Sequence, residues 1–221
     1  MELTPELIVR AYAGGVFPMA ESGRSAKIHW FEPRYRGILP LERFHASRSL
    51  RRRRRRGGYR FSCDQDFAGV MARCADRSET WINPPILRVF TELHRIGLAH
   101  CVAVHGSDGS FVGGVYGLAL GGAFFAESMV SGATDGSKLA LAELVARLRL
   151  GGFTLMDTQY LTPHLASLGG IEIPRAAYRQ RLETALMVRV DGPRAFGPAP
   201  APDGAFWRSE EPVDRQMPDQ E

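Results

Sequence analysis

Residues 110–130 read SFVGGVYGLALGGAFFAESMV, and this stretch decides the predicted fold. Two apolar runs flank Gly121 and Gly122, a pair of the kind that closes a tight β-hairpin. The stretch therefore predicts two neighbouring antiparallel strands. The glycines of the first strand favour a close approach of the backbone, either to a ligand or to another strand.

Further elements are predicted on both sides of this hairpin. The segments HCVAV (100–104) and FTLMDTQ (153–159) are typical of strands, and residues 171–173 predict a shorter one. Helical spacing of apolar residues predicts helices near 64–75, 84–96, 136–150 and 175–186, with Asp135 as a cap of the third. Thr4 followed by Pro5 predicts the start of a first helix. The pattern indicates an α+β protein.

Polar residues interrupt two of the predicted strands. Strand alternation places Phe125, Glu127 and Met129 on one face of the second hairpin strand. It likewise places Leu155, Asp157 and Gln159 on one face of the strand predicted at 153–159. If both strands belong to one sheet, the two faces could line one cleft, and a buried carboxylate there would need a cation or hydrogen bonds. The alternative is that Glu127 and Asp157 are exposed or cap other elements.

Composition excludes several classes of protein. The chain has 221 residues, of which 44% are hydrophobic and 24% charged, as in a globular protein of one domain, with or without a small appendage. No apolar run approaches the ~20 residues of a membrane-spanning helix, and the N-terminus lacks the pattern of a signal peptide. Cys63, Cys74 and Cys101 lie far apart, so we expect small buried side chains in a reducing cytosol and no metal site.

Positive charge is concentrated in one place. The net charge is +4, and Arg51 to Arg56 form an unbroken run, whereas residues 191–221 carry seven acidic residues and three arginines. The run favours a polyanionic partner, above all RNA, because aromatic residues lie near it. A solvated helical charge run is the alternative. Trp30 and Trp81 occur in polar surroundings, where they are either edges of the core or stacking platforms.

Three regions are predicted. Gly57 and Gly58 suggest a boundary between a small N-terminal domain, residues 1–58, and a main domain, residues 59–190. Residues 191–221 contain six of the 14 prolines and little periodicity. We expect this Pro-rich acidic tail to be disordered or loosely docked.

A series of short motifs occurs in a fixed order along the chain. AYAGGVFPM, IHWFEP, RGILPL, FHASRSL, VGGVYG, FFAESM and DTQ with HLASLG together resemble the leucyl/phenylalanyl-tRNA–protein transferase family over about residues 4–187. The resemblance implies a small N-terminal domain followed by a domain like the GCN5-related N-acetyltransferases. It also implies transfer of leucine or phenylalanine from charged tRNA to the N-terminal α-amine of proteins that begin with Arg or Lys, marking them for N-end-rule degradation.

The same resemblance implies the conditions of that reaction. An aminoacyl ester is already activated, so neither a metal nor another cofactor is expected, and catalysis rests on positioning, proton removal and charge stabilisation. The partners would be aminoacyl-tRNA and the acceptor proteins, with no membrane involved. We expect a cytoplasmic monomer.

Roles for individual residues also follow from the resemblance. Asp157 and Gln159 match the D-x-Q motif, in which Gln contacts the attacking amine and Asp orients it or relays charge; a substrate-assisted route through the terminal adenosine hydroxyl is the alternative. Glu127 joins them as a catalytic candidate. The aminoacyl pocket would comprise Met129, Phe125 and Glu127. Trp30 and Trp81 would contact the tRNA 3′ end, and the tRNA phosphates would be held by Arg51, Arg52, Arg53, Arg54, Arg55 and Arg56.

The chain departs from the family pattern at a few positions. Val130 replaces a Phe, and we expect little effect because it lies on the strand face opposite Met129. Two other functions remain as alternatives. An acyl-CoA-dependent N-acetyltransferase would share the fold, but SGATDGSK (131–138) lacks the usual pyrophosphate cradle. A non-catalytic RNA-binding module would bind RNA without transfer.

Overall fold

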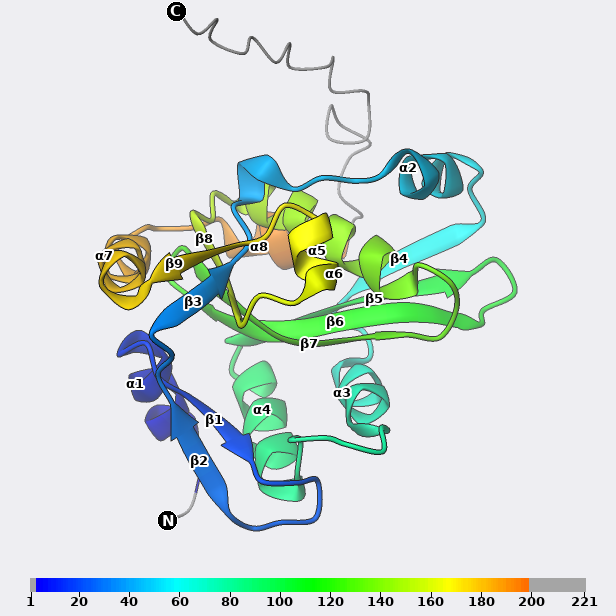
Figure 1. Cartoon of the computed structure of the whole chain (residues 1–221). Helices are drawn as coiled ribbons and strands as arrows, with labels where there is room; N and C mark the ends of the chain where they lie inside the picture. Colours follow the sequence, from blue (N-terminus) through cyan, green and yellow to red (C-terminus); the bar gives the residue numbers. More distant parts are fainter. Residues whose placement is uncertain (1–2, 199–221) are drawn as a thin grey trace, which may run out of the picture.

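The computed structural model describes residues 3–198, and their strands form two sheets (Figure 1). The smaller sheet pairs β1 (Phe17–Ala20) with β2 (Ile28–Phe31). The larger sheet contains β3 (Tyr35–Ile38), β4 (Tyr59–Cys63), β5 (Ala99–Gly106), β6 (Phe111–Leu120), β7 (Ala123–Ser131), β8 (Leu155–Gln159) and β9 (Ile171–Pro174). Its order is β4-β5-β6-β7-β8-β3-β9, antiparallel except for the parallel pair β7 and β8.

Helices cover both faces of the large sheet (Figure 1). One face, here called the α1 face, packs against α1 (Pro5–Ala13), α3 (Phe67–Ala75), α4 (Pro84–Arg95) and α7 (Arg175–Leu186). The other, the α5 face, packs against η1 (Leu41–Arg43), α2 (Arg48–Arg55), α5 (Gly136–Gly151), α6 (Pro163–Ser167) and α8 (Gly192–Phe196). The predicted α+β class is therefore confirmed. No helix within residues 3–198 is long and apolar enough to cross a membrane.

Local sequence explains most element boundaries. The Thr4 side chain accepts a hydrogen bond from the Leu7 amide at the start of α1, as predicted. The Asn83 side chain accepts a hydrogen bond from the Ile86 amide at the start of α4, whose first turn begins with Pro84 and Pro85. Asp135 occupies the N-cap position of α5, as predicted, but its side chain makes no capping bond. Its carboxylate is instead engaged by two cations, as described below.

The expected alternation along β7 is broken by a β-bulge. Tyr116 of β6 pairs with Ser128, whereas its neighbour Gly117 pairs with Ala126, so Glu127 is the extra residue. Phe125 therefore packs on the α1 face and Met129 on the α5 face. The prediction that the two share one face is wrong, because a bulge shifts every following side chain to the other side. Val130 does lie opposite Met129, as predicted.

The ends of the chain are joined to the main sheet more closely than expected. β3 lies before residue 58, yet it is an inner strand of the large sheet, between β8 and β9. Residues 191–198 of the predicted tail, which we expected to be disordered or loosely docked, contain α8, in which Ala195 is fully buried. Arg147 donates to the carbonyl oxygens of Ala195 and Gly197. The remainder of that tail lies outside the described residues.

Candidate functional site

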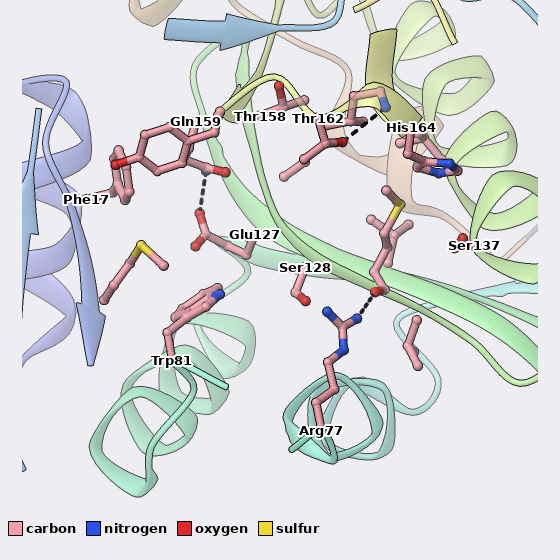
Figure 2. A pocket seen from close by; sticks show the side chains of 18 of the residues that line it. Phe17, Arg77, Trp81, Glu127, Ser128, Ser137, Thr158, Gln159, Thr162 and His164 are labelled. Carbon is pink, nitrogen blue, oxygen red and sulfur yellow. Dashed lines mark hydrogen bonds between the residues drawn. The ribbon is translucent and has the colours of Figure 1, made fainter. Parts of the chain in front are cut away.

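A cavity of about 850 Å³ opens where β7 and β8 stop pairing (Figure 2). The last paired residues are Phe125 and Asp157. Beyond them, the cavity is lined by residues 126–131 of β7, by Thr158 and Gln159 at the end of β8, and by Tyr160. The cavity thus reaches both faces of the sheet through the gap between two parallel strands. The carboxyl ends of such strands are a usual place for ligands to bind.

Asp157 is fully buried beside this cavity but does not line it. Arg36 donates to both of its carboxylate oxygens, from Nε at 2.9 Å and from Nη2 at 2.7 Å. The Tyr178 hydroxyl donates to Oδ2 at 2.7 Å, and the Gln159 amide donates to Oδ1 at 2.8 Å. A carboxylate with four donors is a fixed anchor, because every strong acceptor direction is already used. The alternative of an exposed Asp157 is excluded.

Gln159 occupies a strained turn directly above that anchor. Its φ is +58°, a region that non-glycine residues seldom adopt. The Tyr160 amide donates to the Thr158 carbonyl oxygen across it at 2.6 Å, which makes Gln159 the centre of a γ-turn. This strain is held in place by the bond from the Gln159 amide to Asp157. The turn directs the Gln159 side chain into the cavity, where its Nε2 donates to Glu127 Oε1 at 3.2 Å (Figure 2).

A close backbone contact supports the same turn from β3. A Cβ atom on Gly37 would lie 2.6 Å from the carbonyl carbon of Tyr160. Only a glycine at this position lets the chain after β8 fold back across β3. The Arg36-Gly37 pair therefore supplies both the cation for Asp157 and the space for the γ-turn.

Glu127 is the bulged residue of β7 and is half-buried in the cavity wall. Burial raises the pKa of its carboxyl to about 8, and the negative charge of Asp157 adds to this, whereas Tyr12 and Arg36 oppose it. A group with this pKa exchanges a proton readily near neutral pH. The site therefore joins an amide donor to a carboxyl that is poised to gain or lose a proton.

The apolar end of the cavity lies on the α5 face. Val115, Leu141 and Leu165 line it together with Met129. Phe125 does not belong there: it is fully buried and packs edge-to-face on Tyr12, with ring centroids 5.1 Å apart. The bulge at Glu127 separates Met129 from Phe125, so only Met129 of the two lines this cavity. An apolar end of this kind fits an aliphatic or aromatic side chain of a ligand.

The two predicted tryptophans are not equivalent. Trp81 lines the cavity (Figure 2), and Met19 of β1 is another of its lining residues. Trp30 is half-buried against the α1-face core and does not line the cavity, although its strand partner Pro18 does. The structure thus brings one of the two to the candidate site.

The arginine run forms α2, away from the cavity walls. Arg53 donates to Asp135 Oδ2 at 3.2 Å. The Arg54 guanidinium stacks 4.3 Å from the centroid of the Phe61 ring and lies 3.9 Å from the Glu143 carboxylate. Arg52, Arg55 and Arg56 are exposed and Arg51 is half-buried. The run therefore divides into arginines that attach α2 to the body and arginines that face solvent.

Sequence reasoning missed four residues of this site. Arg36, Tyr178 and Tyr12 surround the two carboxylates from β3, α7 and α1, and Arg77 contacts the Met129 carbonyl oxygen at the cavity wall (Figure 2). Arg36 carried a detectable signal. An arginine inside the apolar strand pattern of RGILPL must find a carboxylate if it is buried.

Within the described part of the chain, the three cysteines lie in the core and not at a metal site. Cys63, Cys74 and Cys101 are free and buried, as predicted, and burial raises the pKa of each thiol. Within residues 3–198, no group of three or more His, Cys, Asp or Glu side chains is arranged to hold a metal ion.

Comparison with known proteins adds an independent finding. Residues 38–183 match the family model described as leucyl/phenylalanyl-tRNA protein transferase, and residues 1–34 match the model of its N-terminal domain. The leucyl/phenylalanyl-tRNA–protein transferase of Cereibacter sphaeroides (strain ATCC 17029) is 59% identical, over 89% of this chain and 89% of its own. The same-named protein of Ruegeria pomeroyi is 57% identical over 84% and 88%.

One comparison with a solved structure gives a low similarity. L-PGS from Bacillus licheniformis has a TM-score of 0.40 and 16% identity, over 73% of this chain and 55% of that chain. A similarity at this level does not establish a shared fold.

Proposed function

Since this chain belongs to the leucyl/phenylalanyl-tRNA–protein transferase family and is thus an aminoacyltransferase, we propose that it moves leucine or phenylalanine from charged tRNA to the N-terminal α-amine of proteins that begin with Arg or Lys. Proteins so modified would enter N-end-rule degradation. One observation carries the proposal. A strained turn holds the side-chain amide of Gln159 against Glu127, and the apolar end of the same cavity begins beside this pair.

The apolar end of the cavity would take the side chain of the aminoacyl group. Val115, Leu141, Leu165 and Met129 offer branched and flexible apolar surface without a polar atom that would reject either leucine or phenylalanine. Discrimination in such a pocket amounts to about 1–3 kcal/mol per methylene, which is compatible with acceptance of both.

The chemistry of transfer needs little from the protein. The amine nitrogen forms a bond to the ester carbonyl carbon, the carbon–oxygen ester bond breaks, and the ribose hydroxyl leaves with a proton. Gln159 would orient the attacking amine through its side-chain amide. Glu127 would face the amine proton or the cationic side chain of the acceptor. A route assisted by the terminal adenosine hydroxyl remains the alternative source of the base.

Asp157 would act as a positioning residue in this scheme. It does not line the cavity, and its four hydrogen bonds fix the turn that aims Gln159. Trp81 would stack near the terminal adenosine, and Trp30 would support the strand pair β1 and β2 that carries Met19. The opening of the cavity between parallel β7 and β8 supports an arrangement like the GCN5-related N-acetyltransferases.

The proposal is tested with leucine-charged tRNA and a peptide that begins with Arg. Labelled leucine should enter this peptide and not a glycine-led control peptide. Gln159→Asn should reduce transfer about 100-fold, because Asn tolerates the positive φ but is too short to reach Glu127. The exposed Gln180→Asn of α7 is the matched control.

Asp157 is a poor choice for the first variant. Asp157→Ala would leave the buried Arg36 guanidinium without its partner, at a cost of about 3–5 kcal/mol in unfolding free energy. A loss of transfer in that variant would then report partly on folding. Transfer at the wild-type rate by Gln159→Asn would contradict the proposed role of the amide.

A further inference from the structure

One carboxylate joins the arginine helix to the cavity wall. Asp135 lies between β7 and α5, and its Oδ2 accepts from Arg53 Nε of α2 at 3.2 Å. Its Oδ1 accepts from Lys138 Nζ at 3.0 Å. The Lys138 bond lowers the pKa of the Asp135 carboxyl, partial burial opposes this, and Arg53 adds to the lowering. Asp135 is therefore ionised at neutral pH and holds two cations from different elements.

The backbone at Asp135 has little freedom to move. Its φ is +62°, which Asp and Asn adopt more readily than most residues. The next residue, Gly136, packs so closely on β6 that a Cβ atom would lie 1.7 Å from the Val112 carbonyl oxygen. On the other side, a Cβ atom on Gly113 would lie 2.2 Å from the Gly136 carbonyl carbon. The start of α5 is thus fixed against β6.

The cavity wall follows immediately. Ser137 lines the cavity, and its amide and hydroxyl both bond to the hydroxyl of Ser131, another lining residue, at 2.9 Å. Figure 2 shows Ser137 on the same side of the cavity as His164. A side chain that fixes α2 to Asp135 therefore fixes α2 to this wall.

We propose that Asp135 is a positioning residue that holds the arginine helix α2 in register with the cavity, so that tRNA phosphates bound to α2 place the aminoacyl end between β7 and β8. The inference rests on the proposed function, since it takes tRNA as the polyanion. Arg52, Arg55 and Arg56 remain exposed for phosphates, whereas Arg53 is used for alignment. Asp135 itself touches no reacting atom.

The charge of Asp135 makes the test discriminating. If the carboxylate merely screened a basic surface, its removal would tighten tRNA binding and raise kcat/KM. If it positions α2, its removal should leave tRNA affinity equal or tighter while the transfer rate falls. Asp135→Asn keeps the αL backbone and removes the charge. We expect kcat for leucine transfer to fall roughly tenfold, with Kd for tRNA unchanged or lower.

A double-mutant cycle supplies the second measurement. Arg53→Gln should lower kcat at least as much as Asp135→Asn does, since Arg53 also bonds to Tyr59, and the double variant should be no slower than Arg53→Gln because the Asp135 link is then already lost. Asp108→Asn, an exposed turn aspartate bonded to Ser110, is the matched control for charge. Thermal midpoints of all variants show whether any loss comes from unfolding.

Each outcome either supports or overturns the positioning role of Asp135. A fall in kcat without a rise in Kd, together with a non-additive cycle, supports the positioning role. An unchanged or faster Asp135→Asn enzyme, or strictly additive losses, overturns it while leaving the proposed function intact. A wild-type protein that transfers no leucine to the arginine-led peptide refutes the proposed function, and this inference falls with it.

Discussion

At the residue scale, the site depends on two groups held in costly states. Gln159 has a positive φ and Glu127 is a carboxyl in a desolvated bulge. Such strain persists only where the surroundings compensate for it, and here the buried Asp157–Arg36 pair and Tyr178 do so. Strain and a perturbed pKa at one place are typical of a functional site.

The pKa of Glu127 predicts a pH-dependent stability difference. Its pKa rises from an ordinary value of 4.5 to about 8, so the folded protein keeps a proton that the unfolded chain has lost between these values. This carboxyl therefore lowers the free energy of unfolding progressively as pH rises from about 4.5 to about 8. Glu127→Gln removes the effect. Relative to wild type, the variant should gain stability between pH 5 and pH 8.5, as measured by urea denaturation.

A flat difference between those pH values would show that Glu127 titrates normally. Glu172→Gln on β9, an exposed glutamate, is the matched control.

At the element scale, the cavity exists because β7 bulges at Glu127 and its pairing with β8 stops at Phe125 and Asp157. β3 supports the end of β8, since it pairs with β8 and leaves room at Gly37 for the chain that follows. The same scale explains α2: Arg53 and Arg54 attach the helix to the body and its outer arginines remain exposed.

Gly37→Ala tests the contact beneath the turn. The added methyl group would meet the Tyr160 carbonyl carbon at 2.6 Å, so either β3 or the γ-turn must move. We expect a loss of about 1–3 kcal/mol in unfolding free energy, and transfer that is reduced even at temperatures where the variant is folded. Gly192→Ala, with no atom within 4 Å of the added methyl group, should behave as wild type. Full activity in a folded Gly37→Ala protein would disprove this dependence.

The division of the arginine run predicts a change in salt dependence. Replacing Arg52, Arg55 and Arg56 by Gln should make the slope of log Kd for tRNA against log salt shallower, by about 0.7–0.9 for each phosphate that the protein no longer neutralises. The thermal midpoint should not change. A matched triple variant at exposed Arg88, Arg95 and Arg181 should keep the wild-type slope. Equal slopes in both variants would favour a solvated helix without a binding role.

At the scale of the whole molecule, α8 near the C-terminal end of the described chain packs against the core on the α5 face. The Phe196 ring stacks on His100 at 3.6 Å between centroids and packs edge-to-face on Phe153. Arg147, itself buried with Glu143 on α5, holds the carbonyl oxygens at the end of α8. Residues 191–198 are thus part of the fold, unlike our expectation for the tail.

Phe196→Ala should weaken this packing. Because the ring is half-buried, we expect a loss of about 2 kcal/mol in unfolding free energy, less than for a fully buried Phe. Hydrogen exchange at the Ala195 amide, bonded to the Asp191 carbonyl oxygen, should become faster. The exposed Arg194→Ala on the same helix serves as the control. Unchanged exchange at Ala195 in Phe196→Ala would show that other contacts hold α8.

Local sequence was sufficient for much of the architecture. Caps at Thr4 and Asn83, the glycine pair at 121–122 and the apolar spacing of the helices depend on neighbours in the chain, so the corresponding elements were predictable. The motifs around Glu127, Asp157 and Gln159 likewise identified residues that the fold brings to one place.

Tertiary structure alone decided how those residues are used. The bulge at Glu127 depends on pairing with β6, and it places Met129 on the α5 face, opposite Phe125, which stays in the core of the α1 face. Asp157 became an anchor because β3 brings Arg36 to it from 121 positions away along the chain. Sequence determines which side chains are available and which local elements they form. Pairing between distant segments determines their faces, their partners and their protonation, because these depend on contacts that no local pattern contains.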